Sequence, residues 1–191
     1  MRRRRPAYTL FQLLILLAFL LLLAGALLPA VLKVRLAAAR MQSQNNLKQI
    51  GLACHNYHDT YGRLPVGVDG KNFSGLVYLL PYIEQDNVFK NTDLTTSPDD
   101  KGNAATRALR LPVYQSPLEP AEQPDPKAGP TSYFLVAGSK HDLDGNDGVF
   151  YKDSATRITD IFDGSSNTLL AIESLRGDGG DRKSTRLNSS H

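Results

Sequence analysis

The pattern of apolar and polar positions changes abruptly near residue 32. From Tyr8 to Leu32 the chain has 25 residues without a charge, nearly all of them Leu, Ala, Ile, Val or Phe. An α-helix rises about 1.5 Å per residue, so about 20 residues cross the ~30 Å hydrocarbon core of a bilayer. The sequence therefore predicts a transmembrane helix over residues 8–32, with Pro29 kinking it or loosening one turn near its outer end.

Beyond Leu32 the apolar residues become one-sided but keep a helical period. They recur at spacings of three and four, with charged and amide side chains between them: Val34, Ala37, Met41, Leu47, Ile50, Cys54, Tyr57 and Tyr61. This spacing predicts an amphipathic helical extension over residues 33–62. We expect Gly62 to cap it and Pro65 to prevent its continuation.

Residues 63–175 have the pattern of a small domain outside the membrane. "SGLVYLLPYIEQDNVFKN" predicts one or two helices, bent at Pro81, with a shared apolar face of Leu76, Leu79, Leu80 and Ile83. Asp93–Gly102 reads as a polar loop and Pro112–Pro130 as an irregular segment. "TSYFLVAG", "GVFYKD" and "NTLLAIES" are strand candidates. The predicted fold class is α+β, with a small antiparallel sheet packed on the outer half of the long helix.

Charge is concentrated at the start of the chain. The formal net charge is +3, from 22 Lys and Arg against 19 Asp and Glu; without Arg2–Arg5 the count is 18 against 19. A neutral body with no basic stripe argues against nucleic-acid binding. The arginine cluster predicts a cytoplasmic N-terminus and a single pass that places the domain outside. A cleaved secretory signal is the alternative, although its apolar region usually spans only about 7–15 residues.

The residues that begin the apolar run resemble a type IV prepilin N-terminus. A short basic leader precedes a small residue, an aromatic residue and then "TLFQLLILL". Further segments, including "LLPAVLKVRLAAARMQSQNNLKQIGLACHNYHDTYGRLP", "LVYLLPYIEQDNVF" and "RITDIFDGSSNTLLAIES", resemble a bacterial family of prepilin-like proteins whose outer domain has no assigned function. The resemblance covers roughly residues 7–174 and implies a pilin-like fold in the bacterial cytoplasmic membrane, with the domain periplasmic or at the cell surface.

The same resemblance implies roles for three N-terminal residues. Prepilin peptidase would cut after residues 1–7, between Ala7 and Tyr8, and Tyr8 would become the methylated first residue. Gln12 occupies the position of the family's glutamate, which neutralises a freed amino terminus during assembly. The implied function is a structural or assembly subunit that packs with other pilin-like subunits. Because Gln12 supplies no negative charge, a non-polymerising, membrane-anchored binding module is the alternative.

Two serines also depart from the family pattern. Relatives commonly carry cysteine at the positions of Ser43 and Ser116, and this chain has Cys54 as its only cysteine, so it forms no intrachain disulfide. We expect Ser43 and Ser116 to be neighbours that join the long helix to "LPVYQSP".

The last residues have a different composition. Residues 176–191 are polar and glycine-rich, and "KSTRLNSSH" resembles translated adapter sequence. We expect a truncated domain with a disordered, non-native tail, we exclude Arg182–His191 from fold reasoning, and we read Arg176-Gly177-Asp178 as a chance tripeptide.

One loop has the spacing of a calcium site. Asp142, Asp144 and Asn146 follow an i, i+2, i+4 pattern, and Asp153 falls at the twelfth position. The sixth position, however, is Asp147 rather than glycine, and the twelfth is usually a bidentate glutamate. The competing interpretation, which we favour, is a Gly/Asp/Asn turn before "GVFY"; beyond this calcium candidate we expect no cofactor.

A second cluster of candidate residues lies near the end of the long helix. His55, His58 and Asp59 lie three and four residues apart near the end of the long helix, where they form either part of a metal site or ordinary last-turn polar residues. The chain contains no G-x-S-x-G, P-loop or HExxH pattern. We therefore expect no enzymatic activity.

Overall fold

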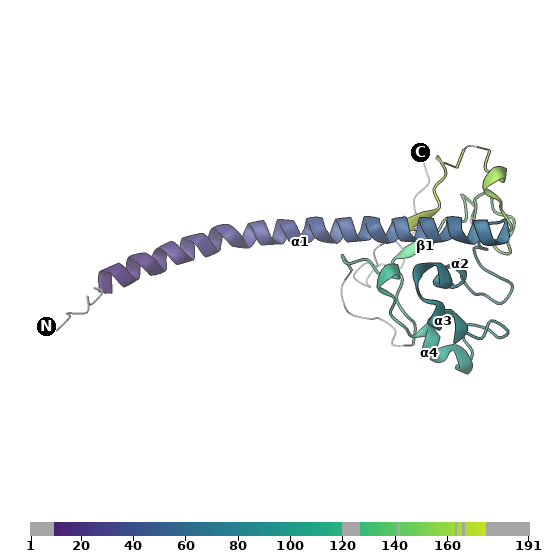
Figure 1. The fold of residues 1–191 in the computed structure, drawn as a ribbon, viewed down its shortest axis with the longest axis horizontal. Coiled ribbons are helices and arrows are strands. Elements are labelled where there is room, and N and C mark those ends of the chain that lie inside the picture. Colours follow the sequence, from purple (N-terminus) through teal and green to yellow (C-terminus); the bar gives the residue numbers. More distant parts are fainter. Residues whose placement is uncertain (1–9, 120–126, 141, 163, 166, 175–191) are drawn as a thin grey trace. The chain divides into compact units, whose positions relative to one another are not determined.

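The computed structural model describes residues 10–119, 127–140, 142–162, 164–165 and 167–174 of the 191-residue chain (Figure 1). It divides into two compact units, residues 1–40 and residues 41–191. The secondary-structure elements, in chain order, are α1 (Leu10–Tyr61), α2 (Gly75–Tyr78), the 3₁₀ turn η1 (Leu80–Ile83), α3 (Asp86–Lys90), η2 (Lys101–Asn103), α4 (Ala104–Arg107), η3 (Pro112–Tyr114), β1 (Tyr133–Leu135), η4 (Ile158–Asp160) and β2 (Ala171–Glu173).

The described part of the first unit is a single helical segment. Helix α1 begins at Leu10 and continues through Pro29. Because proline has no N–H to donate, the carbonyl of Gly25 lacks its usual partner four residues later. Helix α1 continues past Pro29 despite the missing hydrogen bond, as expected for a proline that loosens one turn.

In the second unit, α1 supplies the helix on which the domain is built. Ile50, Ala53, Cys54 and Tyr57 are buried at spacings of three and four residues, as the amphipathic pattern predicts. The helix ends where expected, because Gly62 adopts a left-handed conformation with φ +68° and its N–H donates to the His58 carbonyl at 2.7 Å.

The predicted face of α1 is wrong at four positions. Val34 (68%), Met41 (71%) and Tyr61 (60%) are exposed, and so is Ala37. The polar residues Ser43 and Asn46, in contrast, are buried. The physical reason is hydrogen bonding: Nδ2 of Asn46 donates to the Pro112 carbonyl (3.3 Å), the Gln115 carbonyl (3.1 Å) and the Tyr133 hydroxyl (3.3 Å). A polar side chain with such partners is buried at little cost.

The segment after α1 folds into three short helical turns instead of one or two helices. Ser74 caps α2 by accepting a hydrogen bond from the Leu76 N–H at 3.3 Å. η1 carries proline in its first turn and ends at Glu84, which has φ +63°. The predicted apolar face is confirmed, since Leu76, Leu79, Leu80 and Ile83 are all buried in one core.

The sheet has two antiparallel strands. β1 pairs with β2 in the register Tyr133↔Glu173, Phe134↔Ile172 and Leu135↔Ala171. Tyr133 is fully buried against the core, whereas Phe134 is 43% exposed on the other face. These strands lie within the predicted segments "TSYFLVAG" and "NTLLAIES", and with α1 they confirm the α+β fold.

The third predicted strand, "GVFYKD", is wrong. Gly148 and Phe150 donate to the carbonyls of Ala137 (3.0 Å) and Val136 (3.2 Å), but the chain between them makes bends. Lys152 then forms an isolated parallel bridge with Val68. Asp153 follows with φ +52°, which ends any extended run.

Candidate functional site

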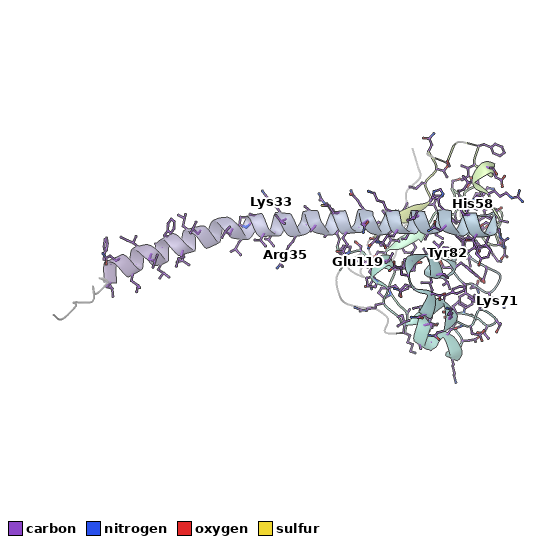
Figure 2. The ribbon with its side chains drawn as sticks, viewed as in Figure 1. Lys33, Arg35, His58, Lys71, Tyr82 and Glu119 are labelled. Atoms are coloured by element: carbon purple, nitrogen blue, oxygen red, sulfur yellow. The ribbon has the colours of Figure 1, made fainter. Side chains whose placement is uncertain are left out.

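The first candidate surface is the apolar segment of α1. Between Leu10 and Leu32 every large apolar side chain is exposed, from 41% at Leu23 to 82% at Leu10. Exposed apolar area on this scale is unfavourable in water and marks a surface that lipid or protein covers. Lys33 and Arg35 are the first charged side chains that follow along the helix (Figure 2).

Length and composition make this segment suitable for a bilayer. In the described part of the chain, α1 is the one helix long and apolar enough to cross a membrane. Its 23 residues from Leu10 to Leu32 extend over about 35 Å, against a hydrocarbon thickness of ~30 Å.

The residues of the prepilin resemblance are placed only in part. Ala7 and Tyr8, the predicted cleavage position, lie outside the described residues. Gln12 lies in the first turn of α1 and is exposed. Its amide is therefore carried on the same helical surface as the apolar side chains.

The candidate calcium loop is organised around Asn146. Its Oδ1 accepts from the N–H groups of Lys140 (3.2 Å) and Asp147 (2.8 Å), and its Nδ2 donates to the carbonyls of Lys140 (3.0 Å) and Asp142 (2.7 Å). Asn146 is 8% exposed. Its oxygen is thus engaged in closing a turn, as the Gly/Asp/Asn turn interpretation predicts.

In the part of the chain that the structure describes, the carboxylates of the same loop do not share a common partner. Asp144 forms an ion pair with Lys152 at 3.4 Å, and Asp153 is exposed after its left-handed turn. Asp147 accepts from the Ser139 hydroxyl (2.6 Å) and the Ser139 N–H (2.7 Å), and these bonds lower its pKa. Nowhere among the described residues do three His, Cys, Asp or Glu side chains gather as a metal site would need.

His58 has a structural contact at the end of α1. Its Nε2 accepts a long hydrogen bond of 3.5 Å from the Ile158 N–H, which opens η4. Its Nδ1 lies 3.7 Å from the carboxylate of the exposed Asp59. His55, one turn earlier, is exposed. Of the two histidines, His58 therefore links η4 to α1, and His55 does not take part in this link.

Ser43 and Ser116 are both buried. Ser43 bonds to Tyr133 and Glu173, whereas Ser116 donates its N–H to the Ser132 hydroxyl at 2.9 Å. The expected junction between α1 and "LPVYQSP" is present, but Asn46 makes it, through the carbonyls of Pro112 and Gln115.

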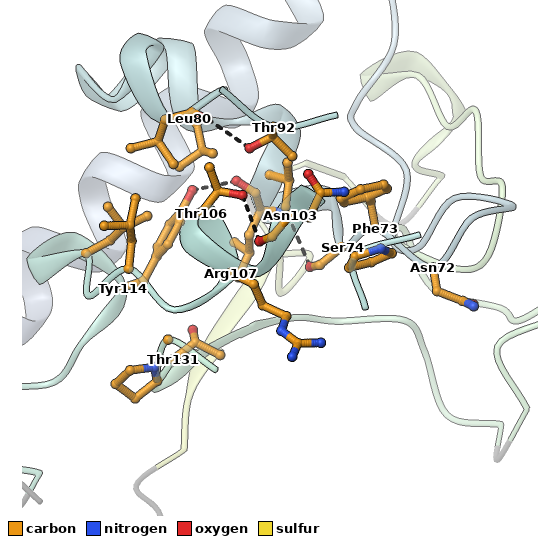
Figure 3. A pocket seen from close by; sticks show the side chains of 18 residues that line it. Asn72, Phe73, Ser74, Leu80, Thr92, Asn103, Thr106, Arg107, Tyr114 and Thr131 are labelled. Atoms are coloured by element: carbon orange, nitrogen blue, oxygen red, sulfur yellow. Dashed lines mark hydrogen bonds between the residues drawn. The ribbon is translucent and has the colours of Figure 1, made fainter. Parts of the chain in front are cut away.

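The second candidate site is a cavity of about 310 Å³ in the domain (Figure 3). Its walls come from α2, η1, α3, η2, α4, η3 and the segments before α2, η3 and β1. Most of the lining is apolar, from Phe73, Leu76, Val77, Leu80, Val88, Leu109 and Leu111. Its volume falls at the small end of the range for small-molecule sites.

Asn103 fixes the wall of this cavity formed by η2 and α4. It is 1% exposed, and its Oδ1 accepts from the Asp93 N–H at 2.8 Å. Its Nδ2 donates to the carbonyls of Asp93 (2.9 Å) and Ser97 (3.0 Å) and to the Thr96 hydroxyl (3.3 Å). With its amide fully used, Asn103 holds the polar loop 93–97 against α4.

Among the described residues that line the cavity, Arg107 is the one with a charged side chain. Its Nε donates to the Lys127 carbonyl at 3.1 Å, and one terminal nitrogen pairs with Asp99. The Arg107 side chain is 29% exposed and that of Asp99 is 86% exposed. This pair therefore lies toward solvent, where ion pairs are weak.

The sequence gives no sign of this cavity or of Arg107. Arg107 stands in "NAATRALRLP", a stretch with no motif and with a second arginine three residues later. The lining residues come from segments up to 59 positions apart, from Asn72 to Thr131. Only their arrangement in three dimensions identifies the site.

Comparison with known proteins identifies the family. Residues 33–190 match the family described as "Protein of unknown function (DUF1559)", and the chain belongs to this family. The match also takes in residues 175–190, beyond the end of the resemblance noted in the sequence. No curated protein and no solved structure matches the chain.

Proposed function

We propose that this DUF1559-family protein is a membrane-anchored, pilin-like structural or assembly subunit that carries a small α+β domain outside the bacterial cytoplasmic membrane. The observation that supports this proposal is the segment Leu10–Leu32 of α1. It is helical and uncharged, and its large apolar side chains are exposed all round.

A covering for this segment must be apolar, because its side chains offer almost no polar group to water. A bilayer provides such a covering, and so do the corresponding helices of neighbouring subunits. The four arginines before the segment orient it with its N-terminus in the cytoplasm. In the proposed assembly the apolar helices pack side by side, and the domains form an outer layer.

The alternative is a membrane-anchored binding module that does not polymerise. Gln12 supports this alternative, because it lacks the negative charge that would pair with a freed amino terminus inside an apolar bundle. The cavity beside Arg107 supports it too. In either function the partners are the lipid bilayer and, if the leader is removed, prepilin peptidase.

The deciding experiment is intact mass and N-terminal analysis of the protein extracted from membranes. A chain that starts at methylated Tyr8 supports the assembly subunit. A chain that still carries residues 1–7 makes the protein a permanent anchor and favours the binding module. A chain cut after Leu32 and released from the membrane contradicts both.

A matched variant tests the role of position 12. If the leader is removed, Gln12→Glu supplies a carboxylate for a neighbour's amino terminus and increases crosslinked oligomers. Gln12→Asn, which changes the side chain without adding charge, leaves the yield unchanged. An equal yield from Gln12→Glu and Gln12→Asn in a processed chain argues against charge pairing at this position.

A further inference from the structure

The cavity of the domain has a mostly apolar lining, and three hydroxyl groups in it already donate hydrogen bonds to the backbone. The Tyr114 hydroxyl donates to the Leu76 carbonyl (2.7 Å), Thr92 donates to the Val88 carbonyl (2.8 Å), and Thr106 donates to the Asn103 carbonyl (3.1 Å). Figure 3 shows these bonds as dashed lines that end on the protein's own backbone. A molecule bound inside would therefore gain binding free energy mainly from apolar contacts. A ligand whose buried part is polar would lose its hydrogen bonds to water without replacing them.

The charged edge of the cavity has one guanidinium nitrogen with no partner among the described residues. Two of the three Arg107 guanidinium nitrogens are engaged, one by the Lys127 carbonyl and one by Asp99. The third, Nη2, has no hydrogen-bond partner among the residues that the structure describes. In Figure 3 the guanidinium stands apart from the apolar side chains.

This arrangement favours a carboxylate over other head groups. A planar guanidinium presents paired N–H donors that match the two oxygens of a carboxylate. Asp99 already pairs through one oxygen with one terminal nitrogen of Arg107, and because Asp99 is 86% exposed this pairing is weak. Within the described part of the chain, a bound carboxylate could accept from Nη2 or take the place of Asp99 on the other terminal nitrogen.

We propose that this cavity binds a small amphipathic carboxylic acid, with its short apolar chain between Leu80, Val88 and Leu109 and its carboxylate on Arg107. The volume of about 310 Å³ limits the ligand to a short alkyl or aryl acid. The proposal is independent of whether the subunit polymerises, because all of these residues belong to the domain.

The test uses the full chain in lipid nanodiscs, because detergent molecules resemble the proposed ligand. Leucine and valine methyl groups are labelled for NMR, and sodium hexanoate is titrated beside 1-hexanol and hexylamine, with empty nanodiscs as the blank. We expect hexanoate to shift the methyl signals of Leu80, Val88 and Leu109 in a saturable way. The signals of Leu64, in the core but outside the cavity, should stay in place.

Two variants separate the head group from the cavity. Arg107→Gln should weaken hexanoate binding at least tenfold, because a hydrogen bond to a charged group is lost. It should leave 1-hexanol binding unchanged, because the apolar lining of the cavity stays the same. The matched control Arg63→Gln removes the same charge from an exposed position outside the cavity and should change neither. Val88→Phe fills the cavity and should abolish both, while the Leu64 signal reports that the domain remains folded.

Three results would overturn the proposal. If hexanoate causes no saturable shift of the methyl signals of Leu80, Val88 and Leu109, the cavity is not its binding site. Shifts confined to the leucines of Leu10–Leu32 would show that hexanoate only enters the bilayer. Equal affinity for hexanoate and hexylamine, or full hexanoate affinity in Arg107→Gln, would show that Arg107 does not select a carboxylate.

Discussion

The Ser43 hydroxyl on α1 donates a hydrogen bond of 2.6 Å to Oε2 of Glu173 on β2, although the two residues are 130 positions apart. The same hydroxyl accepts from the Tyr133 hydroxyl at 3.2 Å. This chain of groups joins the domain's long helix to both strands of its sheet. Because Ser43 is 3% exposed and Tyr133 is fully buried, water does not readily replace either bond.

Replacement of Ser43 by alanine should therefore destabilise the domain. The change leaves the Tyr133 hydroxyl without its acceptor and removes a donor from Glu173, whose Oε1 already has no partner in the described structure. Leaving buried polar groups unpaired costs about 1–3 kcal/mol. Urea unfolding of the full chain in nanodiscs, followed by tyrosine fluorescence, should give a lower midpoint with an unchanged slope.

The control for this change is Ser165→Ala, at an exposed position. It should alter the free energy of unfolding by less than about 0.5 kcal/mol. If Ser43→Ala unfolds at the same urea concentration as Ser165→Ala, the link between α1 and β2 is not a stabilising contact.

Gly138 should tolerate no side chain. Its φ of +127° lies where residues with a Cβ are strained, and a Cβ placed there would meet Oδ1 of Asn146 and Oδ1 of Asp147 at 2.3 Å each. Gly138→Ala should lower the free energy of unfolding by about 2 kcal/mol or more. Gly102→Ala, where a Cβ has nothing within 4 Å, is the control and should be near neutral; similar midpoints for the two variants would contradict the packing of this turn.

The burial of apolar side chains is predictable from the sequence where these side chains recur with a regular period. Ile50, Cys54 and Tyr57 follow the helical repeat, and their burial was predictable from it. Ser43 and Asn46 were not, because their burial depends on partners more than 65 positions away. The irregular course of "GVFYKD" depends on the close approach of Gly148 to the Ala137 backbone, which composition does not encode.

The candidate sites divide in the same way. The apolar segment Leu10–Leu32 is a local property of consecutive residues, so the sequence alone identifies it. The cavity beside Arg107 is made by side chains from six short elements and the loops between them, and no spacing rule connects them. A site of this kind becomes visible only once the fold has brought its walls together.

The Cys54 thiol should be unreactive in the folded domain. Burial raises its pKa from 9.0 to about 12, so at pH 8 only about one thiol in 10⁴ is ionised, and only the thiolate attacks disulfide reagents. Labelling by dithiobis(nitrobenzoate) at pH 8 should be slow in the native protein and fast in urea. Rapid labelling of the native protein would contradict the burial of this residue.

The same shift predicts a loss of stability in alkali. The Cys54 thiol ionises near pH 9 in the unfolded chain but only near pH 12 in the folded domain. The free energy of unfolding is therefore unaffected by this group below pH 9, and it falls by up to about 1.4 kcal/mol per pH unit as the pH rises from 9 toward 12. Burial also raises the pKa values of Tyr114 and Tyr78, the latter with help from its hydrogen bond to Asp69, so they add to the loss above pH 10. Cys54→Ala should unfold with a shallower dependence on pH between 9 and 10; an unchanged slope would contradict the assignment to Cys54.

A charge in the middle of the apolar segment should separate anchoring from assembly. Leu20→Arg adds about 2.5–3.5 kcal/mol to the free energy of insertion, but the remaining leucine, isoleucine, valine and phenylalanine residues each contribute about −0.3 to −0.6 kcal/mol. The variant should therefore remain in the membrane pellet after carbonate washing. Side-by-side packing of these helices is less tolerant, because each neighbour would have to bury an unpaired guanidinium. For an assembly subunit, crosslinked oligomers should disappear while the monomer stays membrane-bound, and the matched Leu20→Met should preserve both. Oligomers that persist in Leu20→Arg would show that the apolar helices do not form the contact between subunits.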